Sequence, residues 1–283
     1  MKADAPQQPF ESEGRISTPR THHVLWTGGF DSTFRVLSLL YSGLTVRPYY
    51  LVETDRRGLM QELAAMVEIR RAVSEVSPPG RLLSLRLTLL DEVPDDLGVA
   101  EAFSTIRRCF YLGSQYRWLA CFAYTLDDRS LELCVHRDDR AYACVSEYLR
   151  SAESSGDFGG GSNLIRAYGK LFGKFGFPIL EMTKVDMWAV AEGHGFDEIL
   201  EMTWFCHKPT RWGRPCGQCN PCRYTIQEGF GWRISWWRRV VGGLNPVVVL
   251  RQWAVHRPNA YRILRKVSGL FRGTANSRNS DLS

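Results

Sequence analysis

Four cysteines lie within seventeen residues, in the segment WFCHKPTRWGRPCGQCNPCRY. Spacings of two residues let successive thiolates converge on one ion, and a cysteine further upstream closes the tetrahedron. Proline and glycine between the cysteines suit the sharp turns that this requires. The predicted ligands are Cys206, Cys216, Cys219 and Cys222. Because four thiolates leave no open coordination position, the pattern predicts a structural rather than a catalytic zinc ion.

Other interpretations of this segment stay open from the residues alone. They are buried free thiols, an iron–sulfur cluster, and a zinc site in which His207 replaces one thiol. Residues 1–23 are polar and lack the apolar stretch of a secretory signal, so we expect thiols or metal ligands rather than disulfides. The remaining cysteines have no ligand spacing, and we expect them to be small buried hydrophobes: Cys109, Cys121, Cys134 and Cys144.

A second segment whose residues could take part in chemistry is VLWTGGFDSTFRVLSLL, residues 24–40. Its pattern predicts a strand, a loop and a helix. Gly28 and Gly29 permit backbone angles closed to other residues. Such a loop directs free N–H groups and the positive end of a helix dipole at one point, which favours a phosphate. Taken alone, a Gly-Gly pair is more often an ordinary turn, here with Asp31 or Ser32 as helix N-cap. The better-known G-x-x-x-x-G-K-[ST] and G-x-G-x-x-G loops do not occur.

The surrounding elements alternate between strands and helices. Predicted strands are TVRPYYLVET, RLLSLRLTLL, SLELCVH and PILEM; predicted helices are RGLMQELAAMVEIRRAVSEV, LGSQYRWLACFAYTL, RAYACVSEYLRSA and TKVDMWAVAEGHG. The first helix should bury Leu59, Leu63, Met66, Val67 and Val73, and the last should begin at Thr183 and end near Gly193 or Gly195. The alternation predicts an α/β fold, a Rossmann-like doubly wound parallel sheet, whose ligands bind at the carboxyl ends of the strands.

Composition divides the chain further. We expect a disordered segment over 1–22, one α/β domain over 23–200, a zinc-binding loop and helix over 201–230, and a basic aromatic helical extension over 231–283. That extension holds ten basic residues and one acidic residue, whereas the remainder holds 26 basic and 29 acidic, so the net charge of +6 combines a strongly basic extension with a slightly acidic body. The glycine-rich stretch 154–178 is a lid-like insertion with a short helix over 164–172 or, equally, a plain loop. No apolar run is long enough to span a membrane, so we expect a cytoplasmic protein.

The two motifs together carry a family resemblance. TGGFDST resembles the S-G-G-x-D-S loop of PP-loop ATP pyrophosphatases, which split ATP into AMP and pyrophosphate; threonine replaces the first serine and keeps the hydroxyl. CGQCNPCR with the upstream Cys206, and FPILEMTKVDMWAVAEGHGF before it, are similar to the 7-cyano-7-deazaguanine synthases of queuosine-type biosynthesis. The resemblance extends from residue 23 to about residue 230.

The resemblance implies site residues. Those expected to hold the departing pyrophosphate of magnesium-bound ATP are Thr27, Gly28, Gly29, Asp31, Ser32 and Thr33. Lys184 matches the lysine of the family's Ser/Thr-Lys turn and would be a second phosphate contact. Asp31, Ser32 and Lys184 are the expected catalytic residues, with Asp31 near the metal and phosphates rather than acting as a base.

It also implies a reaction. A carboxylate or carbonyl oxygen attacks the α-phosphate of ATP, pyrophosphate leaves, and ammonia or an amine displaces AMP. The expected substrate is akin to 7-carboxy-7-deazaguanine. The sequence departs from the family around the substrate, where TIRRCFYLGSQ offers Arg107 and Arg108, and VHRDDRAYACVSEY replaces the usual substrate loop. That loop offers four candidates, with solvated residues at a helix start as an equal alternative: His136, Asp138, Asp139 and Arg140.

Two alternative functions stay open from the sequence. One rival is an RNA-modifying superfamily member that transfers sulfur or an amine to an adenylated base; another is a non-catalytic nucleotide-binding partner module. The extension interleaves arginine with Trp232, Trp236, Trp237 and Trp253. Packing or self-association into a homo-oligomer is the first interpretation, followed by a peripheral membrane surface or a protein partner, and then by nucleic acid.

Overall fold

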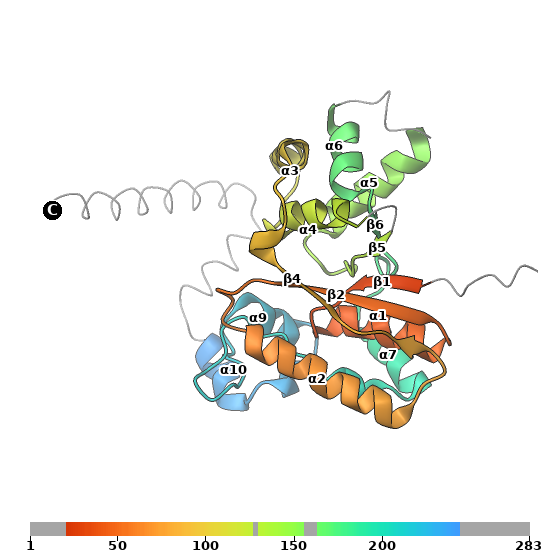
Figure 1. The fold of residues 1–283 in the computed structure, drawn as a ribbon. Coiled ribbons are helices and arrows are strands. Elements are labelled where there is room, and N and C mark those ends of the chain that lie inside the picture. The colour runs from red at the N-terminus through yellow and green to blue at the C-terminus, as the bar shows by residue number, and fades with distance from the viewer. Residues whose placement is uncertain (1–20, 127–129, 156–162, 244–283) are drawn as a thin grey trace, which may run out of the picture. The chain divides into compact units, whose positions relative to one another are not determined.

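The computed structural model describes residues 21–126, 130–155 and 163–243 (Figure 1). These residues form two compact units: the first comprises 21–52 and 68–202, and the second comprises 53–67 and 203–243. Residues 1–20 of the expected N-terminal segment, and residues 244–283 of the extension with Trp253, lie outside the described residues. Thr21 and His22 belong to the first strand.

The described part of the first unit is built on a six-stranded sheet in which all paired strands are parallel. Its order is β3-β2-β1-β5-β6, and β4 also pairs with β2. The strands are β1 (Thr21–Leu25), β2 (Thr45–Val52), β3 (Arg81–Leu82), β4 (Arg86–Leu89), β5 (Leu131–Glu132) and β6 (Phe175–Gly176). The predicted α/β fold with a Rossmann-like parallel sheet is therefore confirmed.

Helices cover both faces of this sheet (Figure 1). One face carries α1 (Phe30–Tyr41), α7 (Lys184–His194) and α8 (Asp197–Glu201), and α1 packs against the other two. The opposite face carries α3 (Leu97–Cys109), α4 (Gln115–Tyr124), α5 (Tyr142–Ser155) and α6 (Asn163–Phe172). A short 3-10 turn, η1 (Leu90–Glu92), leads from β4 towards α3.

The alternation of side chains along the strands determines which residues enter the core. Successive residues of a strand point to opposite faces. On β1, Val24 is fully buried on one face, while Leu25 joins the hydrophobic core on the other. Leu51 of β2 and Phe103 of α3 lie in the same core. The fold thereby holds the carboxyl end of β1 rigidly between two helical layers.

Several predicted elements differ from those observed. RLLSLRLTLL forms two short strands instead of one, SLELCVH pairs over only two residues, and PILEM is not a strand. Its chain instead turns back, with Leu180 N donating to Phe177 O and Met182 N to Ile179 O. Helix α3 was not predicted, because its apolar residues are interrupted by charged ones. These segments depend on distant partners that local patterns do not contain.

In helix α2 (Leu59–Val76), the predicted set of buried residues is partly wrong. Met66 and Val73 are buried as predicted, but Val67 is 62% exposed and Ile69 occupies the buried face in its place. The helix ends before Pro78 as expected. The predicted helix over 164–172 is present as α6.

The second unit contains α9 (Asn220–Gln227), the 3-10 turn η2 (Gly231–Arg233) and α10 (Trp236–Gly243). Its small apolar cluster centres on Cys206, Cys222 and Ile234. In the part of the chain that the structure describes, no helix is long and apolar enough to cross a membrane.

Candidate active site and metal centre

Residues 27–33 comprise the end of the loop after β1 and the first turn of α1, and they are here called the phosphate loop. Gly28 is buried and has a positive φ of 67°, a conformation that favours glycine. Gly29 is the N-cap of α1, so no side chain at this position caps the helix. The alternative in which Asp31 or Ser32 caps the helix is therefore wrong: both residues lie in the first turn. The N–H groups of that turn have no acceptor within the helix, which is the arrangement that binds anions.

Hydroxyl groups brace this loop. Thr27 N donates to Ser32 Oγ at 3.3 Å, Gly29 N donates to Thr27 Oγ1 at 3.4 Å, and Ser32 Oγ donates to Gly29 O at 3.4 Å. These long bonds exist without a ligand and can exchange for stronger ones to phosphate oxygens. Thr27 is exposed and Ser32 is nearly buried, so the Thr27 hydroxyl is the more accessible of the two.

Thr33 has a different environment from the other hydroxyl residues of the loop. It is fully buried, and its Oγ1 accepts a hydrogen bond of 2.9 Å from Nε1 of the equally buried Trp26. This bond ties the first turn of α1 to the residue that follows β1. Direct contact of Thr33 with phosphate stays a prediction; the observed bond fixes the position of the loop.

Asp31 meets two basic groups from other elements. His136 Nε2 lies 3.7 Å from Asp31 Oδ1, and Lys184 Nζ lies 3.9 Å from the same oxygen. We call these three residues the Asp31 cluster. Asp31 Oδ1 is buried, yet it has no hydrogen-bond partner. A buried carboxylate oxygen that has two basic neighbours at 3.7 and 3.9 Å but no hydrogen bond is costly in a folded protein, so its position indicates a site built for a further group.

The sheet explains why these residues converge. β1 and β5 are adjacent and parallel, with His23 opposite Leu131, so the chain beyond each strand emerges at the same edge. Asp31 follows β1 and His136 follows β5. Lys184 opens α7, whose N-cap Thr183 forms a reciprocal capping box with Asp186, and Gly195 ends the helix with a φ of 71°. Both predicted ends of this helix are thus confirmed, and the cap places Lys184 at a fixed first position.

Asp139 lies close to the Asp31 cluster. Burial raises the pKa of the Asp139 carboxyl, and the negative charge of Asp31 adds to this; the Ala141 N–H and His136 act in the opposite direction. Ala141 N donates to Asp139 Oδ1 at 2.8 Å. Two neighbouring carboxyl groups of this kind suit a site that receives cationic or metal-bound charge.

The other residues predicted from the substrate region do not belong to the Asp31 cluster. Asp138 and Arg140 are exposed, and the Arg140 guanidinium lies over the Tyr111 ring at 5.1 Å. Arg107 and Arg108 are exposed at the end of α3. The approach of His136 to Asp31 could not be predicted, since it depends on strand pairing. The polar HRDD segment after a predicted strand was the available signal.

The second unit brings the four predicted zinc ligands together, here called the cysteine cluster. One ligand atom from each of Cys206, Cys216, Cys219 and Cys222 lies within 4.8 Å of all the others. The Sγ atoms of Cys216 and Cys222 are 3.8 Å apart, as are those of Cys219 and Cys206. A tetrahedral zinc ion with Zn–S bonds of about 2.3 Å places its sulfurs about 3.8 Å apart. The four thiols fit zinc, and His207 is not among these ligands.

Local backbone geometry shapes the cluster. Cys216 N donates to Cys206 Sγ at 3.2 Å and Cys219 N donates to Cys216 Sγ at 3.3 Å, bonds that stabilise thiolates. Gly217 has a φ of 77°, and a β-carbon there would lie 2.6 Å from the Arg238 carbonyl oxygen. Cys219 is the N-cap of α9. Turn residues and the helix start therefore position the ligands.

The remaining cysteines are free thiols. Cys121 and Cys144 are buried as expected, Cys134 is partly buried, and Cys109 is exposed, which contradicts the prediction. Cys109 is the last residue of α3, where the helix presents it to solvent. Burial raises the pKa of Cys144 to about 12.

A parallel sheet, a TGGFDST loop at the carboxyl end of β1 and a four-cysteine centre together define the class as the PP-loop superfamily of ATP pyrophosphatases. The family model described as "Queuosine biosynthesis protein QueC" matches residues 23–231. The chain therefore belongs to the QueC family, that of the 7-cyano-7-deazaguanine synthases. No curated protein sequence gives a significant match. Family membership makes the chain an ATP-using enzyme of queuosine biosynthesis.

Proposed function

We propose that this protein is a ligase that adenylates the carboxylate of a 7-carboxy-7-deazaguanine-like substrate and passes the acyl group to ammonia or an amine. The observation that carries the proposal is the buried Asp31 Oδ1, which has no hydrogen-bond partner and lies 3.7 Å from His136 Nε2 and 3.9 Å from Lys184 Nζ, beside a helix N-terminus. That constellation combines N–H donors, an ammonium and a carboxylate, which are the groups that ATP and its magnesium ion require.

The first step joins the substrate to AMP. A substrate carboxylate oxygen attacks the α-phosphorus of ATP, the bond from that phosphorus to the bridging oxygen breaks, and pyrophosphate departs with the electron pair. The N–H groups of the phosphate loop and the Lys184 ammonium stabilise the charge that develops on pyrophosphate. Asp31 is the carboxylate that would hold a magnesium ion arriving with ATP, and such an ion would supply neutralisation of the phosphate charge.

The second step forms the new bond to nitrogen. The amine attacks the acyl carbon, the bond to the AMP oxygen breaks, and one proton leaves the nitrogen. His136 is not that acceptor, because its Nδ1 accepts from Asp138 N at 3.3 Å and the neutral ring therefore carries its hydrogen on Nε2, which faces Asp31; the proton passes to solvent. A nitrile would need a second activation of the resulting amide.

One local observation disfavours sulfur transfer to RNA as the alternative. Thiolating enzymes need a reactive thiolate, and Cys134 is the described cysteine whose pKa responds to the charge of Asp31. Burial raises the Cys134 pKa strongly, and Asp31 raises it further, so this thiol stays protonated at neutral pH. Amide formation requires no such nucleophile.

The decisive test replaces Asp31 by asparagine and measures pyrophosphate release from ATP in the presence of ammonia and candidate deazapurine acids. We expect Asp31→Asn to lower the rate by about a thousandfold, because a neutral amide binds the magnesium ion of ATP more weakly than a carboxylate does. Asp138→Asn is the matched control, as its exposed carboxyl lies outside the Asp31 cluster. An unchanged rate in Asp31→Asn would overturn the proposed role.

The same incubations identify the substrate by mass spectrometry. Formation of AMP and pyrophosphate in equal amounts with an amidated or nitrile product supports the proposal. Equal amounts of AMP and pyrophosphate without a deazapurine product would keep the adenylation chemistry and replace the substrate. The absence of both from every acid tested would instead favour a non-catalytic nucleotide-binding module.

A further inference from the structure

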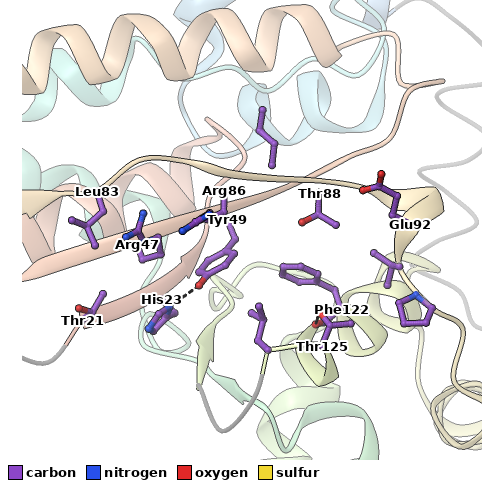
Figure 2. A pocket seen from close by; sticks show the side chains of 14 residues that line it. Thr21, His23, Arg47, Tyr49, Leu83, Arg86, Thr88, Glu92, Phe122 and Thr125 are labelled. Atoms are coloured by element: carbon purple, nitrogen blue, oxygen red, sulfur yellow. Dashed lines mark hydrogen bonds between the residues drawn. The ribbon is translucent and has the colours of Figure 1, made fainter.

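A pocket of about 780 Å³, separate from the candidate active site, lies within the first unit on the sheet face that α4 covers. β1, β2, β4 and the end of α4 all contribute to its lining (Figure 2). No residue of the phosphate loop or of the Asp31 cluster lines it. Its residue His23 precedes Thr27 by four positions, about 13 Å along an extended strand. The volume is in the range of sites that bind small molecules.

The pocket exists because α4 covers only part of the sheet. On this face, β2 presents Arg47, Tyr49 and Leu51 in turn, and β1 presents His23 before Leu25. Leu51 and Leu25 pack in the core, whereas Arg47 and His23 remain partly exposed. α4 ends at Tyr124, and Phe122 in its last turn lines the pocket together with Thr125 and Leu126 beyond it. Polar side chains on an inner sheet face therefore border a cavity instead of a helix.

Aromatic rings form one wall of this pocket. The His23 and Tyr49 ring centroids are 5.7 Å apart, and those of Tyr49 and Phe122 are 6.0 Å apart. His23 Nδ1 and the Tyr49 hydroxyl are joined by a hydrogen bond of 3.0 Å, drawn as a dashed line in Figure 2. This bond holds two of the rings in place. Tyr49 and Phe122 are themselves buried, so the partly exposed His23 ring, which they support, is the aromatic surface against which a planar ligand can pack.

Two guanidinium groups give the pocket its charge. Arg47 Nη1 donates to Ser84 O at 3.1 Å, which uses one of its five N–H groups. Within the described part of the chain, neither Arg47 nor Arg86 forms an ion pair. Glu92 lines the opposite end of the pocket from Arg47 (Figure 2). The charges are thus separated, with donors at one end and an acceptor at the other.

We propose that this pocket binds a small planar aromatic carboxylate. Its ring packs on the His23 imidazole, which Tyr49 and Phe122 support from behind, its carboxylate accepts hydrogen bonds from Arg47 and Arg86, and an N–H group on the ring donates to Glu92. Guanidinium groups bind carboxylates with paired hydrogen bonds, which distinguishes this chemistry from general attraction of anions. The site is separate from the Asp31 cluster and does not depend on the proposed function.

Isothermal titration calorimetry on the full chain tests the proposal with three probes: 2-naphthoate, its neutral amide 2-naphthamide, and inorganic phosphate. We expect 2-naphthoate to bind at one site and more tightly than either other probe. Arg47→Gln and Arg86→Gln should each weaken 2-naphthoate about tenfold while leaving 2-naphthamide unchanged. Arg81→Gln is the matched control, because Arg81 is an exposed arginine of β3 outside the pocket.

A second arm tests the acceptor end. 6-Amino-2-naphthoate should bind more tightly than 2-naphthoate to the parent chain, and Glu92→Leu should remove that preference. Circular dichroism melts verify that each variant is folded. Equal affinity of 2-naphthoate for the parent and the two arginine variants would overturn the proposal, as would phosphate binding as tightly as 2-naphthoate. Pyrophosphate release should be unaffected by Arg86→Gln, so this outcome is independent of the test of Asp31.

Discussion

The phosphate loop and the cysteine cluster are both short motifs, but different forces hold them in place. The phosphate loop is anchored by buried residues, since Trp26 directly before it and Thr33 at its end are inaccessible and bonded to each other. The cysteine cluster lies in a unit whose buried cluster consists of Cys206, Cys222 and Ile234. We therefore predict that the first motif keeps its shape without a ligand, whereas the second depends on a metal ion for its stability.

Removing the metal gives the largest expected effect. Binding of a structural zinc ion contributes roughly 10 to 16 kcal/mol of apparent free energy at neutral pH. Treatment with a chelator, or the substitution Cys222→Ser, should therefore unfold the segment around residues 203–230 and expose it to proteolysis. Limited digestion followed by mass spectrometry measures this, and elemental analysis should find one zinc per chain.

Cys109→Ser is the matched control for that experiment, because Cys109 is an exposed thiol without ligand spacing. Its zinc content and its digestion pattern should equal those of the parent. A brown protein containing iron would contradict the assignment of zinc. A chelated chain that resists proteolysis as the parent does would show that packing alone holds the cluster, and the contrast with the phosphate loop would disappear.

The second-largest effect is expected from substituting Lys184, which tests whether the site at the phosphate loop is catalytic. Lys184→Met should lower the rate of pyrophosphate release about a hundredfold, since an ammonium that stabilises the leaving group is lost. The helix should remain, because its cap is formed by Thr183 and Asp186. Lys184→Arg keeps the charge and should retain most of the rate. A Met variant as fast as the parent would exclude Lys184 from catalysis.

The comparison also shows what the sequence can predict. Loop, helix start and cysteine spacing are local: TGGFDST, the Thr183 cap and Cys216 to Cys222 could all be assigned from neighbouring residues. The strand ends and the meeting of His136 with Asp31 could not, because they depend on the pairing of β1 with β5. PILEM failed as a strand for the same reason: its apolar residues Ile179 and Leu180 are buried in a turn.

A smaller effect should follow from breaking the bond that braces the phosphate loop. Thr33→Val keeps the side-chain shape but leaves Trp26 Nε1 buried without an acceptor, which should lower the free energy of unfolding by about 1 to 3 kcal/mol. Thr27→Val is the control, because Thr27 is exposed and its hydroxyl makes only long bonds. Urea denaturation measures both. Equal losses in the two variants would mean that the Trp26–Thr33 hydrogen bond contributes no more to the free energy of unfolding than the bonds of the exposed Thr27 hydroxyl.

The smallest expected effect is a dependence of stability on pH at Asp139. Its pKa is raised above the ordinary value of 3.8, chiefly by burial and also by Asp31. Between that value and the raised one, the unfolded chain binds fewer protons at this site than the folded chain does. The free energy of unfolding contributed by Asp139 therefore falls as pH rises through this window, and the loss persists above it.

Asp139→Asn removes this ionisation and keeps an oxygen that can accept the hydrogen bond from Ala141 N. The melting temperature of the variant relative to the parent should consequently increase between pH 4 and pH 8, with the gain complete once the parent carboxyl is ionised. Asp138→Asn should show no such trend, because its carboxyl is exposed. A relative melting temperature that stays flat or decreases would mean that Asp139 is charged at little cost in the folded protein. Asp139 would then resemble an ordinary surface carboxylate, and the electrostatic setting of the Asp31 cluster would need to be assigned to His136 and Lys184 alone.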